Sequence, residues 1–231
     1  MTPGGIPVRR VGWLDGLRGI AALQVLLLHY ASAFQPAIGL RLPTLMHNRW
    51  EAAFIHTPLF FPFDGYTAVY VFFLISGVVL TQAFERMPLA MATGILRRVV
   101  RLGLPMVAAL AFGALLFALM PAANLAAAEQ SGSRTWLGAG GPSEVSLLSL
   151  AHQAAFEGMF VGYGGVSLLP GWLGLLMGIV PHMRSFDVPL WTLHVEFYGS
   201  LIVLLLVALR AVASRRLYLT SCLALGLLWV P

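Results

Sequence analysis

The sequence predicts an all-α fold, a polytopic bundle of transmembrane helices. Of its 231 residues, 59% are hydrophobic and only 10% are charged, whereas soluble domains contain about 25% charged residues. The mean hydropathy is +0.84, and several apolar runs approach the roughly 20 residues that cross a bilayer as a helix. The chain is therefore expected to be an integral membrane protein, with the lipid bilayer as its first partner.

The charge pattern supports this class of protein. The net charge is +5, and the basic residues are all arginines, most of them at or near the ends of apolar runs. Arginines so placed indicate membrane topology and contacts with anions, not a nucleic-acid surface. The single cysteine, Cys222, can form no disulfide within the chain.

The apolar run 14–34 predicts the first span, and the basic residues Arg9 and Arg10 predict a cytoplasmic tail at 1–12 before it. A signal peptide is the alternative for this region. Ala31-Ser32-Ala33 has the small-residue pattern of a cleavage site and follows a basic segment and an apolar one.

Two ionisable residues, Arg18 and His29, lie in this first span. Positions so spaced on a helix are about 16 Å apart along the axis and about 20° apart around it, so both side chains share one face. An ionisable residue inside a span usually faces a bundle interior or a wet cavity. Arg18 could bind an anionic group, and His29 could take a proton from a hydroxyl. The alternatives are snorkelling of Arg18 or its pairing with Asp15, and an interfacial position for His29.

The next elements follow in order. Residues 35–65 are expected to form an external loop with a short interfacial helix near 49–55, and residues 66–84 form the second span. A basic cluster then marks the cytoplasmic start of the third span, 102–120, which tolerates Pro105 in its first turn.

The long segment 121–189 is expected to contain an amphipathic interfacial helix at 144–156. Its short apolar piece at 166–180 suggests a re-entrant or cavity-lining element. The fourth span is expected at 190–209, and the run 217–230 is too short to complete a fifth. The arginines give this arrangement an N-in topology.

The fourth span contains a carboxylate, Glu196, which must be protonated, paired or exposed to a polar cavity. Thr192 and Ser200 lie one turn away on either side and can hydrogen-bond it. A structural bond to another span is the alternative. Trp191 is interpreted as a headgroup-level aromatic, and His194, on a different face, as interfacial packing.

The remaining candidates are a basic cluster and a small-residue pair. The cluster is either a positive-inside anchor or a docking site for a phosphate-rich cytosolic donor, and consists of Arg97, Arg98 and Arg101. Ser76-Gly77 is interpreted as a close helix contact. The histidines and carboxylates show no clustered ligand spacing, so no metal site is expected.

Four motifs occur together and in order: LDGLRGIAALQVLLLHY, FFLISGVVL, RRVVRLGLP and LWTLHVEF. In this combination the chain resembles acyltransferase family 3, the integral membrane O-acyltransferases, over residues 13–231. The resemblance implies a membrane enzyme that transfers an acyl group, commonly acetyl from acetyl-CoA, to a hydroxyl of a carbohydrate or lipid-linked envelope acceptor. Acyl-CoA is then a co-substrate, and no bound cofactor is implied.

The resemblance also implies roles for individual residues. His29 matches the catalytic base and Arg18 its motif partner, with Glu196 grouped beside them as catalytic. Arg98 and Arg101, with the adjacent Arg97, match the arginines that meet the acyl donor. The residues expected to line or support the site are Asp15, Ser76, Gly77 and Trp191.

Members of this family usually have about ten membrane spans, each of roughly 20 residues. The chain, with about five, is therefore expected to be the N-terminal half of the family domain, incomplete at its C-terminus, in the cell's inner membrane with a cytoplasmic N-terminus. The alternative is a non-enzymatic membrane protein. It would be either a transporter for small solutes whose broken segment 158–181 lines a pathway, or a truncated, inactive relative.

Overall fold

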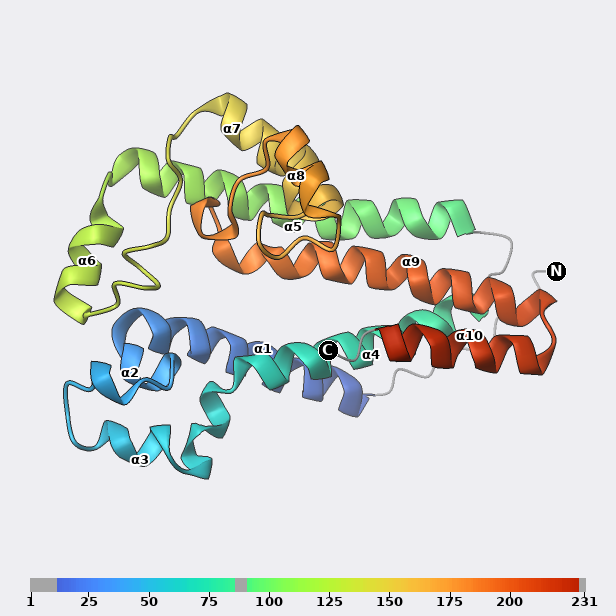
Figure 1. Ribbon diagram of the computed structural model, residues 1–231, viewed down its shortest axis with the longest axis horizontal. Coiled ribbons are helices and arrows are strands. Elements are labelled where there is room, and N and C mark those ends of the chain that lie inside the picture. Colours follow the sequence, from blue (N-terminus) through green and yellow to red (C-terminus); the bar gives the residue numbers. More distant parts are fainter. Residues whose placement is uncertain (1–11, 86–90, 229–231) are drawn as a thin grey trace. The chain divides into compact units, whose positions relative to one another are not determined.

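The computed structural model describes residues 12–85 and 91–228. In these ranges the chain forms helices and turns, with one isolated β-bridge between Gly164 and Pro181 and no strand. It divides into two compact units, Met1–Ile75 and Ser76–Pro231. Figure 1 labels the helices of both units. The predicted all-α fold is confirmed. The expected tail at 1–12 lies, apart from Gly12, outside the described residues.

Four of the described helices are long and apolar enough to cross a membrane: α1 (Gly12–Phe34), α4 (Gly65–Glu85), α5 (Met91–Leu119) and α9 (Trp191–Val212). Each of them overlaps one of the four complete spans that the sequence predicts. The run expected to be too short for a fifth span forms α10 (Arg215–Leu228), which has 14 residues.

Helix α5 begins earlier than predicted. The third span was expected to start at residue 102, but α5 starts at Met91 and includes the whole arginine cluster. Arginine is a good helix former, so these charges end an apolar run without ending the helix. Pro105 consequently lies in the helix interior, not in the first turn, and its missing N–H deprives the Arg101 carbonyl of its helical donor.

In the first unit, short helices and turns follow α1, and α2 and η2 among them pack against it. They are α2 (Pro36–Gly39), α3 (Glu51–Ile55) and the 3-10 turns η1 (Pro43–Leu45) and η2 (Pro58–Phe63). The short helix expected near 49–55 is thus confirmed as α3. A Cβ on Gly39 would collide with the backbone of Ser32, so α2 lies directly against α1. The candidate cleavage stretch Ala31-Ser32-Ala33 is helical and buried at this contact.

In the second unit, a π-helix, η3 (Gln153–Val161), packs against both α5 and α9. It continues from α7 (Leu147–His152), where the Ser146 hydroxyl accepts a hydrogen bond from the Ser149 N–H. The helix expected at 144–156 therefore starts later and extends further. The shorter elements around it are α6 (Ala123–Ser131), α8 (Gly171–Met177), η4 (His182–Arg184) and η5 (Val188–Leu190).

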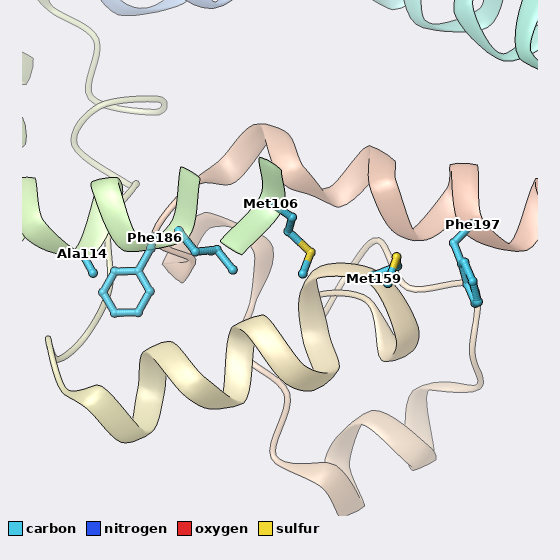
Figure 2. Packing of buried hydrophobic residues seen from close by; sticks show 6 residues of the cluster. Met106, Ala114, Met159, Phe186 and Phe197 are labelled. Atoms are coloured by element: carbon cyan, nitrogen blue, oxygen red, sulfur yellow. The ribbon is translucent and has the colours of Figure 1, made fainter. Parts of the chain in front are cut away.

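The core of this unit joins helices that are far apart in the sequence. Figure 2 shows side chains from α5, from η3, from the segment before α9 and from α9 itself meeting in one cluster. Its buried members are Met106, Leu110, Ala114, Met159, Phe186 and Phe197. The apolar piece predicted at 166–180 forms only the seven-residue α8, with irregular chain on both sides.

The contact between α5 and the segment before α9 leads to a prediction. A Cβ on Gly113 would lie 2.5 Å from the Phe186 carbonyl oxygen, whereas one on Gly103 of the same helix would meet nothing within 4 Å. We expect Gly113→Ala to lower the free energy of unfolding by about 1–3 kcal/mol, because backbone must shift. Gly103→Ala should be neutral or slightly stabilising. Thermal unfolding in detergent checks this, and equal midpoints for the two variants would contradict the packing.

Candidate functional site

Arg18 lies one turn after Asp15 on α1, with a side chain that is 26% exposed. Its Nη1 is 4.0 Å from Asp15 Oδ1, and its guanidinium lies 6.0 Å from the centre of the Phe72 ring. The Asp15 side chain is 66% exposed, and an ion pair this long and this exposed contributes little. Arg18 Nε is buried and has no hydrogen-bond partner among the described residues. Arg18 therefore keeps donor capacity that the described residues do not use.

His29 is half-buried and lies where α4 begins. A Cβ on Gly65 would be 2.7 Å from Leu28 Cδ2 and 3.2 Å from Val25 Cα, so α4 starts in tight contact with the turn that carries His29. Helix α1 is continuous, so Arg18 and His29 share one helix face as predicted. They are separated by about 16 Å along the helix axis.

The structure brings together Arg98 and Glu196, which come from two separate sequence motifs. Arg98 Nη2 donates to Glu196 Oε1 at 2.7 Å, and Arg98 Nε donates to Ser200 Oγ. The side chains of the charged pair are only 12% and 15% exposed. The interhelical bond that was the alternative for Glu196 is thus present.

The expectation that Thr192 and Ser200 hydrogen-bond the Glu196 carboxylate is wrong. The Ser200 hydroxyl donates to the backbone carbonyl of Glu196, and the Thr192 hydroxyl donates to the carbonyl of Pro189. Hydroxyls within helices commonly bond carbonyls three or four residues earlier, which leaves the carboxylate to Arg98.

The ion pair also lies deeper along the helices than the sequence suggested. Glu196 and Arg210 are 14 residues apart, or about 21 Å along α9, and α9 is apolar enough to span a membrane up to Arg210. Arg98 pairs with Glu196 and lies within the part of α5 that is long and apolar enough to cross a membrane, Thr93–Leu119.

Arg97 and Arg101 lie one turn apart on α5, and both are exposed. Within the described residues, neither forms an ion pair with a carboxylate. Like charges at this helical spacing repel one another. An anion bound between the two guanidinium groups would relieve that repulsion.

Three other residues expected to line the site lie in α9 and α4: Trp191, Ser76 and Gly77. Trp191 is the first residue of α9 and is half-buried, and Ser76 is buried in α4. The Gly77 carbonyl accepts a hydrogen bond from the Thr81 hydroxyl at 2.8 Å. The role of these residues in a site stays a prediction.

The interpretation of His194 as interfacial packing is wrong. It is 1% exposed, its Nδ1 lies 3.1 Å from the Met159 carbonyl oxygen, and the Leu168 N–H donates to its Nε2 at 3.1 Å. Since a backbone N–H only donates, Nε2 is the acceptor and Nδ1 carries the proton. A Cβ on Gly162, which has φ +81°, would lie 2.9 Å from His194 Cδ2, so glycine is needed there.

Sequence reasoning did not single out Glu157 and Gln153, two buried polar side chains of η3. Glu157 Oε1 accepts from the Val180 N–H at 2.7 Å, and Gln153 Oε1 accepts from the Phe186 N–H at 3.1 Å. Burial raises the pKa of Glu157, partly offset by the Val180 N–H and by His152. The sequence does contain a signal that could have identified Glu157: it is a carboxylate in an apolar run, as Glu196 is.

In residues 12–85 and 91–228, no group of three or more His, Cys, Asp or Glu side chains is arranged to hold a metal ion.

Comparison with known proteins gives one match. The sequence model of acyltransferase family 3, described as an acyltransferase domain, matches residues 11–231. No curated protein and no solved structure matches the chain. The matched range includes both the Arg18–His29 helix and the Arg98–Glu196 pair.

The buried carboxylate of η3 gives a prediction. Glu157→Ala removes the acceptor of the Val180 N–H and should cost about 1–3 kcal/mol of unfolding free energy. Glu157→Gln keeps an acceptor oxygen and removes a buried charge, so it should cost less.

Unfolding measured against pH separates these variants further. Because burial raises the native pKa of Glu157 above its ordinary 4.5, this group stabilises the fold at low pH. That stabilisation is lost as pH rises through the native pKa. The Gln variant should lack this contribution, and identical pH profiles for wild type and Glu157→Gln would contradict it.

Proposed function

Since the chain belongs to acyltransferase family 3, we propose that it transfers an acyl group, acetyl in the usual case, from acyl-CoA to a hydroxyl of a carbohydrate or other envelope acceptor. The observation that carries this proposal is the Arg18–His29 helix. It provides a guanidinium and an imidazole on one face of a continuous membrane-spanning helix, within the range matched by the family.

His29 is the proposed general base. Its neutral imidazole takes the proton of the acceptor hydroxyl while the hydroxyl oxygen attacks the thioester carbonyl carbon. A C–O bond forms, the C–S bond breaks, and the CoA thiolate leaves with the bonding electron pair. The proton on the imidazolium passes to that thiolate, so His29 returns to its starting state and no oxidant or metal is needed.

Arg18 is proposed to hold an anionic or polar group of the donor or of the intermediate. Its unused donor capacity and permanent charge suit this role. Because it lies about 16 Å from His29 along α1, the group that it holds is remote from the reacting carbonyl.

The arginines of α5 are proposed to receive the phosphates of acyl-CoA. Arg97 and Arg101 are exposed, and Arg98 is held beside them. Arginines at this depth in a membrane need an anion or a wet cavity, and a phosphate-rich donor supplies the anion. With the arginines near the ends of the spans as topology signals, we further propose an inner-membrane location with the N-terminus in the cytoplasm.

The base is tested by His29→Ala in an assay of acyl transfer from acetyl-CoA to envelope glycans. We expect activity to fall by about 100-fold or more, the usual contribution of a general base, without loss of membrane insertion. His56→Ala is the matched control, because His56 is an exposed histidine of the same unit. Unchanged transfer by His29→Ala would overturn the base, and solute uptake without any acyl transfer would favour a transporter.

The donor site is tested by Arg97→Ala and Arg101→Ala. Each should raise KM for acetyl-CoA about tenfold or more, the effect of losing a hydrogen bond to a charged group. Arg216→Ala, an exposed arginine of α10, should leave KM unchanged. Inverted topology in the α5 variants, seen by labelling of engineered cysteines from either side, would instead support the positive-inside anchor.

A further inference from the structure

We infer that Glu196 and Ser200 are positioning residues that act through Arg98, and that these three side chains form a clamp which fixes α5 against α9. By fixing α5, the clamp sets the direction in which Arg97 and Arg101 face the anionic part of the acyl donor. This inference rests on the donor site proposed above.

The geometry of the clamp is specific. One arginine side chain reaches two residues that lie a full turn apart on the same face of α9. Arg98 Nη2 donates to the Glu196 carboxylate at 2.7 Å, while Arg98 Nε donates to the Ser200 hydroxyl. The Ser200 hydroxyl in turn donates to the Glu196 carbonyl, which fixes its lone pairs toward Arg98. The guanidinium plane is therefore held at two points.

The helical repeat transmits this constraint to the neighbouring arginines. Residues on a helix advance by about 100° each, so Arg97 is about 100° and Arg101 about 60° from Arg98, and the two are about 40° apart. With Arg98 directed at α9, Arg97 and Arg101 are both exposed. A rotation of α5 that released Arg98 would turn both guanidinium groups away from their present direction.

Glu196 has no acid–base task in this arrangement. Its carboxylate accepts from a guanidinium that does not deprotonate in proteins, and the pair is largely buried. Removing the carboxylate leaves the Arg98 charge inside the bundle without its counter-charge, which favours displacement of α5. A purely through-space effect has the opposite sign, because deleting a negative charge near an anion site strengthens anion binding.

Steady-state kinetics with acetyl-CoA tests the clamp. We expect Glu196→Ala to raise KM for acetyl-CoA about tenfold with little change in kcat, since binding and not the chemical step is affected. Ser200→Ala should shift KM in the same direction by less. Thr192→Ala is the matched control, because its hydroxyl lies one turn away from Glu196 but bonds Pro189, and its KM should not change.

The exchanged pair R98E/E196R is the decisive variant. It restores an ion pair between α5 and α9 with the charges reversed, so KM should return to within about threefold of wild type. A lower KM in Glu196→Ala, or an exchanged pair as impaired as the single variants, would overturn the clamp.

Unfolding measurements separate failure of the clamp from failure of the donor site. In a double-mutant cycle with Arg98→Ala and Glu196→Gln, the two substitutions should be coupled in thermal unfolding without any substrate. Absence of coupling overturns the clamp and leaves the donor site standing. Coupling combined with unchanged KM in Arg97→Ala and Arg101→Ala overturns the donor site, and with it the positioning role.

Discussion

The second unit depends on how the irregular chain at 162–190 satisfies its backbone N–H groups. Apart from the short helix α8 and the turns η4 and η5, this chain lacks the hydrogen-bond ladder of a helix, so its N–H groups need other acceptors. Three buried side chains supply acceptors instead: His194 for Leu168, Glu157 for Val180 and Gln153 for Phe186. All three come from η3 or α9, the elements that form the apolar core with α5. These hydrogen bonds and the apolar packing therefore stabilise the same arrangement. Apolar side chains of equal size cannot replace the polar ones, because they offer no acceptor.

A related constraint governs the charges. Burying Arg98 and Glu196 removes their hydration. This desolvation cost cancels much of the free energy that their attraction contributes, so the pair adds little net stability. Burying only one of the two charges would cost far more free energy than burying the pair. The pair therefore strongly favours the helix register in which the two side chains meet. The apolar contacts of α5, such as that of Met106 (Figure 2), are non-directional. The two-point hydrogen bonding to α9 is directional, so the ion pair adds an orientational constraint to that of the packing.

The spans and the Arg18–His29 spacing could be predicted because both follow from local properties, the length of apolar runs and the helical repeat. The start of α5 could not, because arginine ends an apolar run but favours the helix. The partner of Glu196 is 98 residues away in the sequence, and only tertiary packing sets the register between the two helices. His194 was correctly expected to face away from Glu196, since two residues rotate a helix by about 200°. Its place beneath the irregular chain depends on the π-helix and on Gly162, which no periodicity in the sequence indicates.

The separation of Arg18 and His29 also limits which donors suit this helix. A base and an anion-binding group about 16 Å apart on one face fit a substrate whose charged end is far from its reacting carbonyl. Acyl-CoA has this form, because the pantetheine arm separates the phosphates from the thioester. A compact donor such as acetyl phosphate carries its charge beside the carbonyl and could engage only one of the two residues. If the proposed function holds, this spacing suits a long donor, with Arg18 in the proposed binding role and His29 in the proposed chemical step.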